Sequence, residues 1–127
     1  MDTEKKIIAK LHPSGFKMSD SNFYSLNILN DNNIYYTLCS HNIETHGRVY
    51  RYEPESDKVL LFADLGEVTG EKGRKSLPQG KSHTPIFEVE GKIYISTHYG
   101  FYQGNDGKEE PAPPPEGYSP YPGGRII

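Results

Sequence analysis

Two stretches of sequence decide the fold expected for this chain: Asn-Ile-Tyr-Tyr-Thr-Leu at residues 33–38 and Lys-Ile-Tyr-Ile-Ser-Thr at residues 92–97. The second begins 59 residues after the first, and in both Ile-Tyr is followed by an apolar or aromatic residue and then Ser or Thr. Gly-Arg-Val-Tyr at residues 47–50 returns 77 residues later as Gly-Arg-Ile-Ile at residues 124–127. The chain therefore contains an internal repeat of two units, and the second carries 18 additional residues, the difference between 77 and 59.

Both units read as short strands separated by turns, and no segment sustains the period of an amphipathic helix. Turn-forming clusters stand at residues 31–33, 54–57 and 90–91. The strands expected around them are residues 23–29, 34–39, 48–53 and 59–63 in the first unit, and residues 83–89 and 92–97 in the second. We therefore predict an all-β fold built from antiparallel strands.

The repeat also divides the chain into segments. The first unit takes residues 20–64, a Gly- and Lys-rich connection takes residues 65–82, and the second unit takes residues 83–127 with a Pro-, Gly- and Tyr-rich loop at residues 99–123. Residues 1–19 are ambiguous, because Ile7, Ile8 and Leu11 suit either a short helix or an outer strand.

Four short strands in a unit repeated at about 60 residues resemble the blades of the β-propeller family. Tyr-Glu-Pro-Glu-Ser-Asp-Lys at residues 52–58 is similar to the hairpin that joins the two outer strands of kelch-like and lyase-like propeller blades. The resemblance covers about residues 20–98 and the last four. It implies antiparallel four-stranded blades, of which about one and a half are present. The remaining blades then come from the same longer chain, which we favour, or from self-association.

Composition excludes several classes of protein. The chain has 127 residues, a formal net charge of −3 and a pI near 5.9, which argue against a nucleic-acid-binding domain. Its one cysteine, Cys39, excludes an internal disulfide and a multi-thiolate zinc site. No apolar run is long enough for a membrane span, and the charged N-terminus lacks a signal-peptide core. We expect a soluble protein, cytoplasmic by default, with its compartment left open.

A pair of histidines is the first candidate site. If Glu90-Gly91 is a two-residue turn, paired positions across the hairpin sum to 181, and His83 faces His98 beside Tyr99. The equivalent positions one unit earlier are Tyr24 and Cys39, so the pair is not a repeated feature. Neutral histidines ligate divalent metals, and a histidine pair also serves in acid–base catalysis. The alternative is a hydrogen-bonded pair at a strand end.

The loops supply the candidate ligand-binding residues. In the resembled architecture, the loops that follow the second strand and those that join blades share the face where ligands bind. Here those are residues 40–47, 65–82 and 99–123, with His41 and His46 in the first of them. Ligand-binding candidates are Tyr102, Lys81 and Arg74, the last beside Lys72 and Lys75. A basic loop attracts carboxylated or sulfated ligands, and tyrosines stack on sugars. A solvated connection and a rigid crossover are the alternatives.

Two functions follow from these expectations. The first is a propeller fragment that binds a small carbohydrate-like or anionic ligand on its loop face. If it also cleaves that ligand, the resemblance implies a lyase or hydrolase acting on a carbohydrate or lactone, with His83, His98 and Tyr99 as catalytic residues and His83 and His98 as ligands of a divalent metal. The second is a non-catalytic propeller scaffold for protein partners. The sequence contains no phosphate-binding loop and no Gly-x-Ser-x-Gly elbow.

Overall fold

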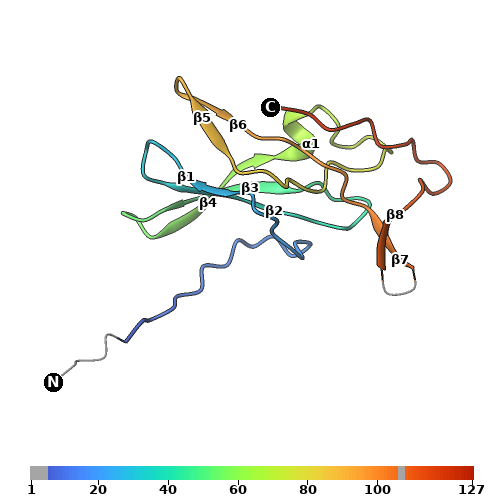
Figure 1. The fold of residues 1–127 in the computed structure, drawn as a ribbon. Helices are drawn as coiled ribbons and strands as arrows, with labels where there is room; N and C mark the ends of the chain where they lie inside the picture. Colours follow the sequence, from blue (N-terminus) through green and yellow to red (C-terminus); the bar gives the residue numbers. More distant parts are fainter. Residues whose placement is uncertain (1–5, 106–107) are drawn as a thin grey trace.

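Four antiparallel strands in chain order form the first sheet of the computed structural model, which describes residues 6–105 and 108–127 (Figure 1). The first sheet consists of β1 (Leu26–Ile28), β2 (Ile34–Leu38), β3 (Arg48–Glu53) and β4 (Lys58–Asp64). Two hairpins follow a one-turn helix, and these elements are α1 (Leu65–Val68), β5 (Phe87–Val89), β6 (Lys92–Tyr94), β7 (Tyr102–Asn105) and β8 (Lys108–Pro111). All sheets are antiparallel, so the prediction of an all-β, antiparallel fold is confirmed.

The hairpin between β5 and β6 has the predicted register. Phe87 pairs with Tyr94 and Val89 with Lys92, so paired positions sum to 181. Glu90 and Gly91 both have positive φ, 51° and 72°, which a two-residue turn of the type favoured in hairpins requires.

The sequence repeat is also a repeat of strand pairing. In the first unit, Thr37 of β2 pairs with Val49 of β3. In the second unit, Ser96 pairs with Ile126 in an isolated antiparallel bridge, which the amide–carbonyl bonds between Ile95 and the C-terminal residue extend. These positions differ by the 59 and 77 residues that separate the matching sequence motifs. The last residues of the chain therefore occupy, in the second unit, the position that β3 occupies in the first.

A pair of hydroxyl groups recurs at the same place in both units. Ser25 Oγ and Thr37 Oγ1 are 2.8 Å apart and buried, and Thr84 Oγ1 and Ser96 Oγ are 2.6 Å apart. Each pair joins the first two strands of its unit where the regular ladder ends.

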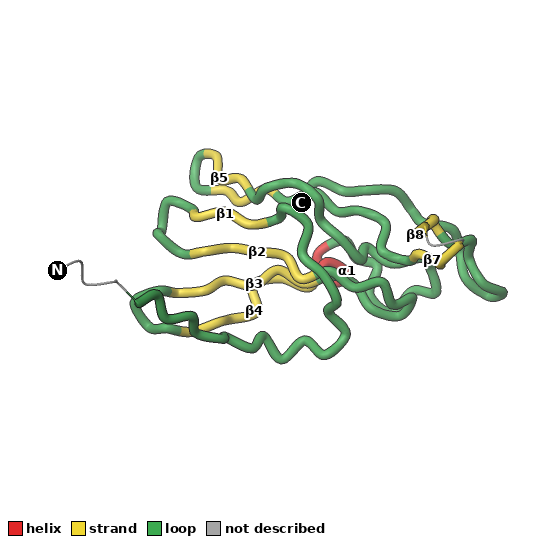
Figure 2. Tube along the Cα trace, turned by 60° about the horizontal axis from the view of Figure 1, so that its bottom comes forward, coloured by secondary structure: helices red, strands yellow, loops and turns green. Residues whose placement is uncertain are grey.

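The core lies between the two units. One side of the first sheet supplies buried Leu29, Tyr35 and Val49, and helix α1 adds Leu65. Ile86 and Ile95 of the second unit pack against them. Figures 1 and 2 show the β5–β6 hairpin lying over the β1 side of the first sheet, and the chain after it crossing above the sheet toward α1. Apolar burial between the layers is what holds the two units together.

Two predicted loops contain regular structure. Residues 65–82 were expected to be a connection without structure of its own, yet residues 65–68 form α1 because Asp64 caps it, accepting hydrogen bonds from the Gly66 and Glu67 amides. The predicted loop at residues 99–123 contains the β7–β8 hairpin, although residues 106 and 107 lie outside the described residues. Both loops are therefore more structured than their composition indicates.

Two predicted strands are shorter than expected. The strand at residues 23–29 begins only at Leu26, because Tyr24 has a φ of 55°, outside the extended region. The strand at residues 83–89 begins only at Phe87, since Pro85 has no amide hydrogen for a ladder.

The N-terminal segment is neither a helix nor a strand over residues 6–19, and residues 1–5 lie outside the described part. Ile7, Ile8 and Leu11 are more than four-fifths exposed, so neither alternative weighed for this segment holds. The segment lies along the first sheet, where the His12 ring is 4.9 Å from that of Tyr52. Across the described residues, no helix has the length and apolar character needed to cross a membrane.

Candidate functional site

The imidazole rings of His83 and His98 lie together, with centroids 4.6 Å apart and planes inclined by 22°. The backbone pairing behind this contact differs from the predicted pairing of His83 with His98. The backbone of His98 pairs with Lys81, through amide–carbonyl bonds of 3.1 and 2.8 Å, so the partner directly opposite is Lys81. The residue numbers of paired positions sum to 181 in the β5–β6 hairpin but to 179 where Lys81 pairs with His98. His83 and His98 are therefore not the directly opposite pair that the sequence predicted. The rings meet as diagonal neighbours, and both side chains keep exposed surface.

The protonation of the two histidines follows from their surroundings. His98 Nδ1 lies 3.1 Å from the Tyr99 carbonyl oxygen, which only accepts hydrogen bonds, so Nδ1 carries a proton and Nε2 holds the lone pair of the neutral ring. The pKa of His83 lies below its ordinary value of 6.5, first because the ring is partly removed from water and then because His98, Lys81 and His41 repel a further positive charge. The pKa of His83 is therefore lowered, as expected for one member of a close histidine pair.

Lys81, the backbone partner of His98, is almost fully buried, with 3% of its surface exposed. Its ammonium nitrogen is 3.9 Å from the centroid of the Tyr102 ring and 4.7 Å from that of Phe23. The Phe23 ring in turn lies 4.9 Å from the His83 ring. Aromatic faces attract a cation, so the two rings hold the positive charge of Lys81 inside the cluster.

His41 joins the cluster from the loop after β2. Its Nδ1 lies 2.8 Å from Asp20 Oδ1, and its amide donates to Asp20 Oδ2 at 2.9 Å. Burial by itself would raise the pKa of Asp20, but hydrogen bonds from Ser21 and His41 outweigh it and lower that pKa. The ionised carboxylate thereby fixes the orientation of the His41 ring, whose centroid is 5.6 Å from that of Tyr102.

A groove of about 450 Å³ opens beside the histidines; we call it the aromatic groove. The Tyr99 ring contacts two other lining tyrosines, with its centroid 5.3 Å from that of Tyr102 and 5.4 Å from that of Tyr121. The Tyr99 hydroxyl donates to the Ala112 carbonyl, which leaves its ring as the groove wall. The residues that line the groove are Leu77, His98, Tyr99, Tyr102, Pro111, Ala112 and Tyr121.

A close backbone crossing brings these segments together. A β-carbon on Gly80 would lie 2.5 Å from both Gly100 Cα and the Ser40 carbonyl oxygen, and one on Gly100 would lie 2.4 Å from Gly80 Cα. Only glycine fits at either position. The crossing sets Lys81 beside His98 and leads the chain directly into Tyr102.

A buried polar network holds the far wall of the groove. The Tyr121 hydroxyl donates to Gln79 Oε1 at 2.7 Å, and Gln79 Nε2 donates to the Gly123 carbonyl and to both oxygens of the Glu71 carboxylate. Gln79 and Glu71 are 0% and 2% exposed. Arg125 Nε lies 3.6 Å from Glu71 and partly balances its charge.

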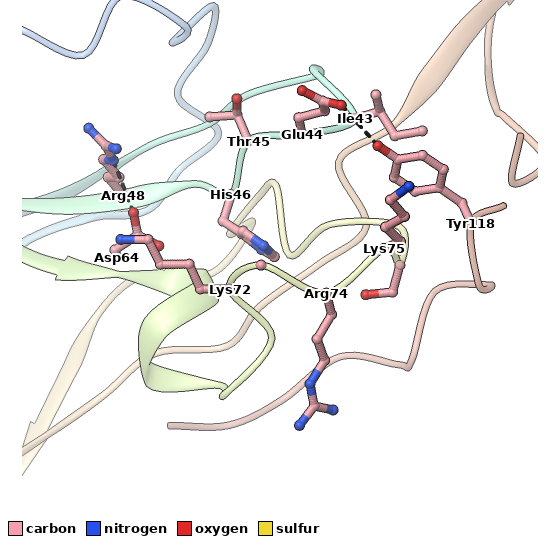
Figure 3. Close-up of a pocket in the computed structure, with 12 residues that line it drawn as sticks. Ile43, Glu44, Thr45, His46, Arg48, Asp64, Lys72, Arg74, Lys75 and Tyr118 are labelled. Atoms are coloured by element: carbon pink, nitrogen blue, oxygen red, sulfur yellow. Dashed lines mark hydrogen bonds and ion pairs between the residues drawn. The ribbon is translucent and has the colours of Figure 1, made fainter.

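Arg74 lies apart from the other candidates, on a second hollow that we call the basic pocket. Figure 3 shows the His46 ring reaching into this pocket of about 320 Å³, with Lys75 beside Tyr118 and the Arg74 side chain extending away from the hollow. Its lining residues are Ile43, Glu44, Thr45, His46, Arg48, Asp64, Lys72, Gly73, Arg74, Lys75, Ser76 and Tyr118.

Local contacts offset part of the positive charge in the basic pocket. Arg48 Nε is 3.1 Å from Asp64 Oδ2. The carboxylate of Glu44 adds a negative charge to the lining and accepts a hydrogen bond from the Tyr118 hydroxyl. His46 Nδ1 accepts a hydrogen bond of 3.1 Å from the Gln79 amide, and burial lowers the pKa of His46. The ring is therefore held neutral, with its proton on Nε2.

The two candidate metal ligands, His83 and His98, are not part of a larger set of ligand side chains in the described residues. No group of three or more His, Cys, Asp and Glu side chains in the described part of the chain is arranged to hold a metal ion. Cys39 is buried, and burial raises the pKa of its thiol. A raised thiol pKa is the opposite of what an activated cysteine needs.

The structure thus brings five of the six sequence-predicted site residues together: His83, His98, Tyr99, Tyr102 and Lys81. Arg74 is the one it places elsewhere. Sequence reasoning missed Phe23, Asp20 and Gln79, and no motif or spacing in the chain marks them.

Comparison with known proteins gives no match, whether to a family model, to a curated protein or to a solved structure.

Proposed function

We propose that the aromatic groove binds a small carbohydrate that carries a carboxylate, such as a sugar acid. The observation that carries this proposal is the position of the Lys81 ammonium, 3.9 Å from the Tyr102 ring that lines the groove. Tyrosine rings offer an apolar face to the C–H groups of a sugar ring and a polar edge to its hydroxyls. A positive charge held behind that wall favours an anionic ligand.

The size and the lining of the groove suit such a ligand. A hollow of about 450 Å³ lies within the range of pockets for small molecules. Its walls come from three tyrosines, one histidine, Leu77, Pro111 and Ala112, so most of the lining is aromatic or apolar with a few polar groups. The exposed surface of His98 is open to a molecule in the groove.

Cleavage of the ligand is the second part of the proposal. In an eliminative lyase step, neutral His98 Nε2 removes the proton from the carbon beside the carboxylate. The electrons of that C–H bond form a carbon–carbon double bond, the glycosidic C–O bond breaks, and the leaving oxygen takes a proton from water. The lone pair on His98 Nε2 is the base of this step, and the lowered pKa of His83 favours the neutral form of the neighbouring ring.

We further propose that the two units are propeller blades. The four-stranded antiparallel sheet, the repeated strand pairing and the packing of one unit on the other support this frame. In a propeller the aromatic groove would lie on the loop face, where the chain connects its units. A protein scaffold is the alternative role, and it predicts no affinity for sugars.

Calorimetry with glucuronate, and with glucose as the uncharged control, tests the binding proposal. We expect glucuronate to bind more tightly than glucose, Tyr102→Ala to lower its affinity at least tenfold, and Lys81→Met to remove the preference for the acid. Tyr24→Ala is the matched control, because Tyr24 is 85% exposed and is not among the groove residues. No binding of glucuronate, or an equal loss with Tyr24→Ala, would refute the proposal.

The cleavage step has its own readout. A lyase acting on an oligouronate forms a conjugated double bond, which absorbs in the near ultraviolet. We expect His98→Gln to abolish this absorbance while glucuronate still binds. Binding without any product in the wild-type chain would leave a binding module and reject the lyase step.

A further inference from the structure

The lining of the basic pocket is more positive than negative, although the chain as a whole has a net charge of −3. The carboxylates of Glu44 and Asp64 stand against four cationic side chains, Arg48, Lys72, Arg74 and Lys75. The pocket shares no lining residue with the aromatic groove. It is therefore a separate hollow, in which the local field favours an anion.

The charges in this lining are not equally available to a ligand. Asp64 is occupied, since Oδ1 accepts from two amides of α1 and Oδ2 lies 3.1 Å from Arg48 Nε. Lys72 pairs with Glu67, but both side chains are 57% exposed, and exposed pairs of this kind are weak. Lys75 makes no ion pair within the part of the chain that the structure describes. The ammonium groups of Lys72 and Lys75 thus remain open to an anion.

The His46 ring adds a neutral hydrogen-bond donor whose orientation is fixed. Its Nδ1 accepts from the Gln79 amide, so the proton lies on Nε2, which has no acceptor among the described residues. The ring rests on the backbone of Gly66, where a β-carbon would lie 2.3 Å from His46 Cδ2. Figure 3 shows the ring entering the pocket, with Lys72 and Lys75 on opposite sides of it in this view.

A phosphate monoester suits these donors better than a carboxylate does. Its phosphoryl group carries about −1.5 to −2 charges near pH 7 and presents three acceptor oxygens, so it can meet donors on several sides. A carboxylate presents two oxygens in one plane. Lysine binds phosphate as a point charge and needs no planar pairing. The mixture of two ammonium groups and one imidazole donor is therefore suited to a phosphoryl group.

The hollow also has room for the organic part of such a ligand. Its volume of about 320 Å³ lies at the lower end of the range for small-molecule pockets. A further hollow of about 530 Å³ shares Arg74, Lys75 and Ser76 with it. The Lys75 carbonyl accepts a hydrogen bond of 2.8 Å from the Ser119 amide, which fixes the loop between the two hollows.

We propose that the basic pocket binds the phosphate group of a small phosphate monoester, with His46 Nε2 and the ammonium groups of Lys72 and Lys75 as donors. Arg74, whose side chain extends away from the hollow, adds to the positive field without touching the phosphate. This proposal does not rest on the sugar-acid proposal for the aromatic groove, because the two hollows have no lining residue in common.

Calorimetry with glycerol 3-phosphate, and with glycerol as the uncharged control, tests this proposal. We expect glycerol 3-phosphate to bind, glycerol not to bind, and methyl sulfate, which carries a single charge, to bind more weakly. Lys75→Gln should lower the affinity for glycerol 3-phosphate about tenfold, the usual effect of losing one hydrogen bond to a charged group. Lys92→Gln is the matched control, because Lys92 of β6 is exposed and lines neither hollow.

Nuclear magnetic resonance locates the ligand. Glycerol 3-phosphate should shift the ring signals of His46 and leave those of Tyr99 and Tyr102 in place. His46→Phe keeps a ring against Gly66 and removes the donor, so it should also weaken binding, and circular dichroism checks that both variants keep the wild-type fold. No binding, equal affinity of Lys75→Gln and the wild type, or shifts confined to the aromatic groove would each overturn the proposal. Glucuronate binding without glycerol 3-phosphate binding would overturn this proposal alone.

Discussion

His83 and His98 stack their imidazole rings at a centroid distance of 4.6 Å, although the backbone of His98 is hydrogen-bonded to Lys81. Three ionisable side chains, His83, His98 and Lys81, therefore lie close together. Lys81 is buried against Phe23 and Tyr102, and its charge is one of the causes that lower the pKa of His83.

His83 should titrate below its ordinary pKa of 6.5 in a nuclear magnetic resonance titration of the histidine ring protons. Loss of water around the ring is the larger cause, and repulsion from His98 and Lys81 follows. His98→Phe keeps an aromatic ring against His83 and removes its charge, so the pKa of His83 should rise toward 6.5 without reaching it. A His83 that titrates above 6.5 in the wild type would contradict this electrostatic account.

Stability should fall on the acid side of neutrality because the pKa values of His46 and His83 are both lowered in the folded state. The folded chain then binds fewer protons than the unfolded chain just below pH 6.5. The stabilisation is complete above pH 6.5 and is lost as the pH falls through the folded pKa values. Urea denaturation at several pH values measures this slope, which approaches about 1.4 kcal/mol per pH unit for one proton.

His46→Gln isolates the share of His46 in that slope. Its Nδ1 accepts the Gln79 amide hydrogen, and protonation would break this bond. We expect the variant to lose part of the acid sensitivity that the wild type shows between neutral pH and pH 5. An unchanged slope would assign the effect to other groups.

Gly80→Ala or Gly100→Ala should destabilise the fold by about 1–3 kcal/mol, as overpacking does. A new β-carbon would lie within 2.5 Å of backbone atoms in both cases, and backbone cannot move aside as a side chain can. Chemical denaturation measures the change. Gly104→Ala is the control, since no atom lies within 4 Å of a β-carbon there.

Gln79→Leu should cost about 1–3 kcal/mol, because it removes the amide that donates to the buried carboxylate of Glu71 and the oxygen that accepts from the hydroxyl of Tyr121. Glu71 is 2% exposed, so water cannot replace the lost donor. Removing both partners with Gln79→Leu and Glu71→Met should cost less than the two single changes added. Additive losses would mean that the network has no coupling energy.

Asp64→Ala should destabilise the chain by about 0.5–2 kcal/mol, the usual cost of losing a helix cap. Asp64 accepts from the Gly66 and Glu67 amides and from Arg48 Nε. Asp64→Asn should restore the cap and not the ion pair, and its melting temperature should lie between those of the wild type and Asp64→Ala. An alanine variant as stable as the wild type would contradict this role.

The strand content and the hairpin register could be predicted because they depend on neighbours in the sequence. Glu90-Gly91 suits a turn with two positive φ angles, and that turn sets which residues of β5 and β6 pair. The match between residues 47–50 and 124–127 is likewise a match in strand pairing, because Ser96 pairs with Ile126 as Thr37 pairs with Val49. Local signals failed where one residue broke the pattern, as Pro85 and Tyr24 did.

The composition of the site depended on contacts between distant segments. The sequence by itself determined the all-β class, the two-unit repeat and the neighbourhood of His83 and His98, because turn chemistry and period-two alternation act over a few residues. Only the tertiary structure decided that Gly80 and Gly100 cross and that Phe23 and Tyr102 enclose the ammonium of Lys81. It also set Arg74 on a different hollow. The physical reason is that close packing of backbones and burial of a charge are properties of surfaces that meet in space, and no short stretch of sequence contains both surfaces.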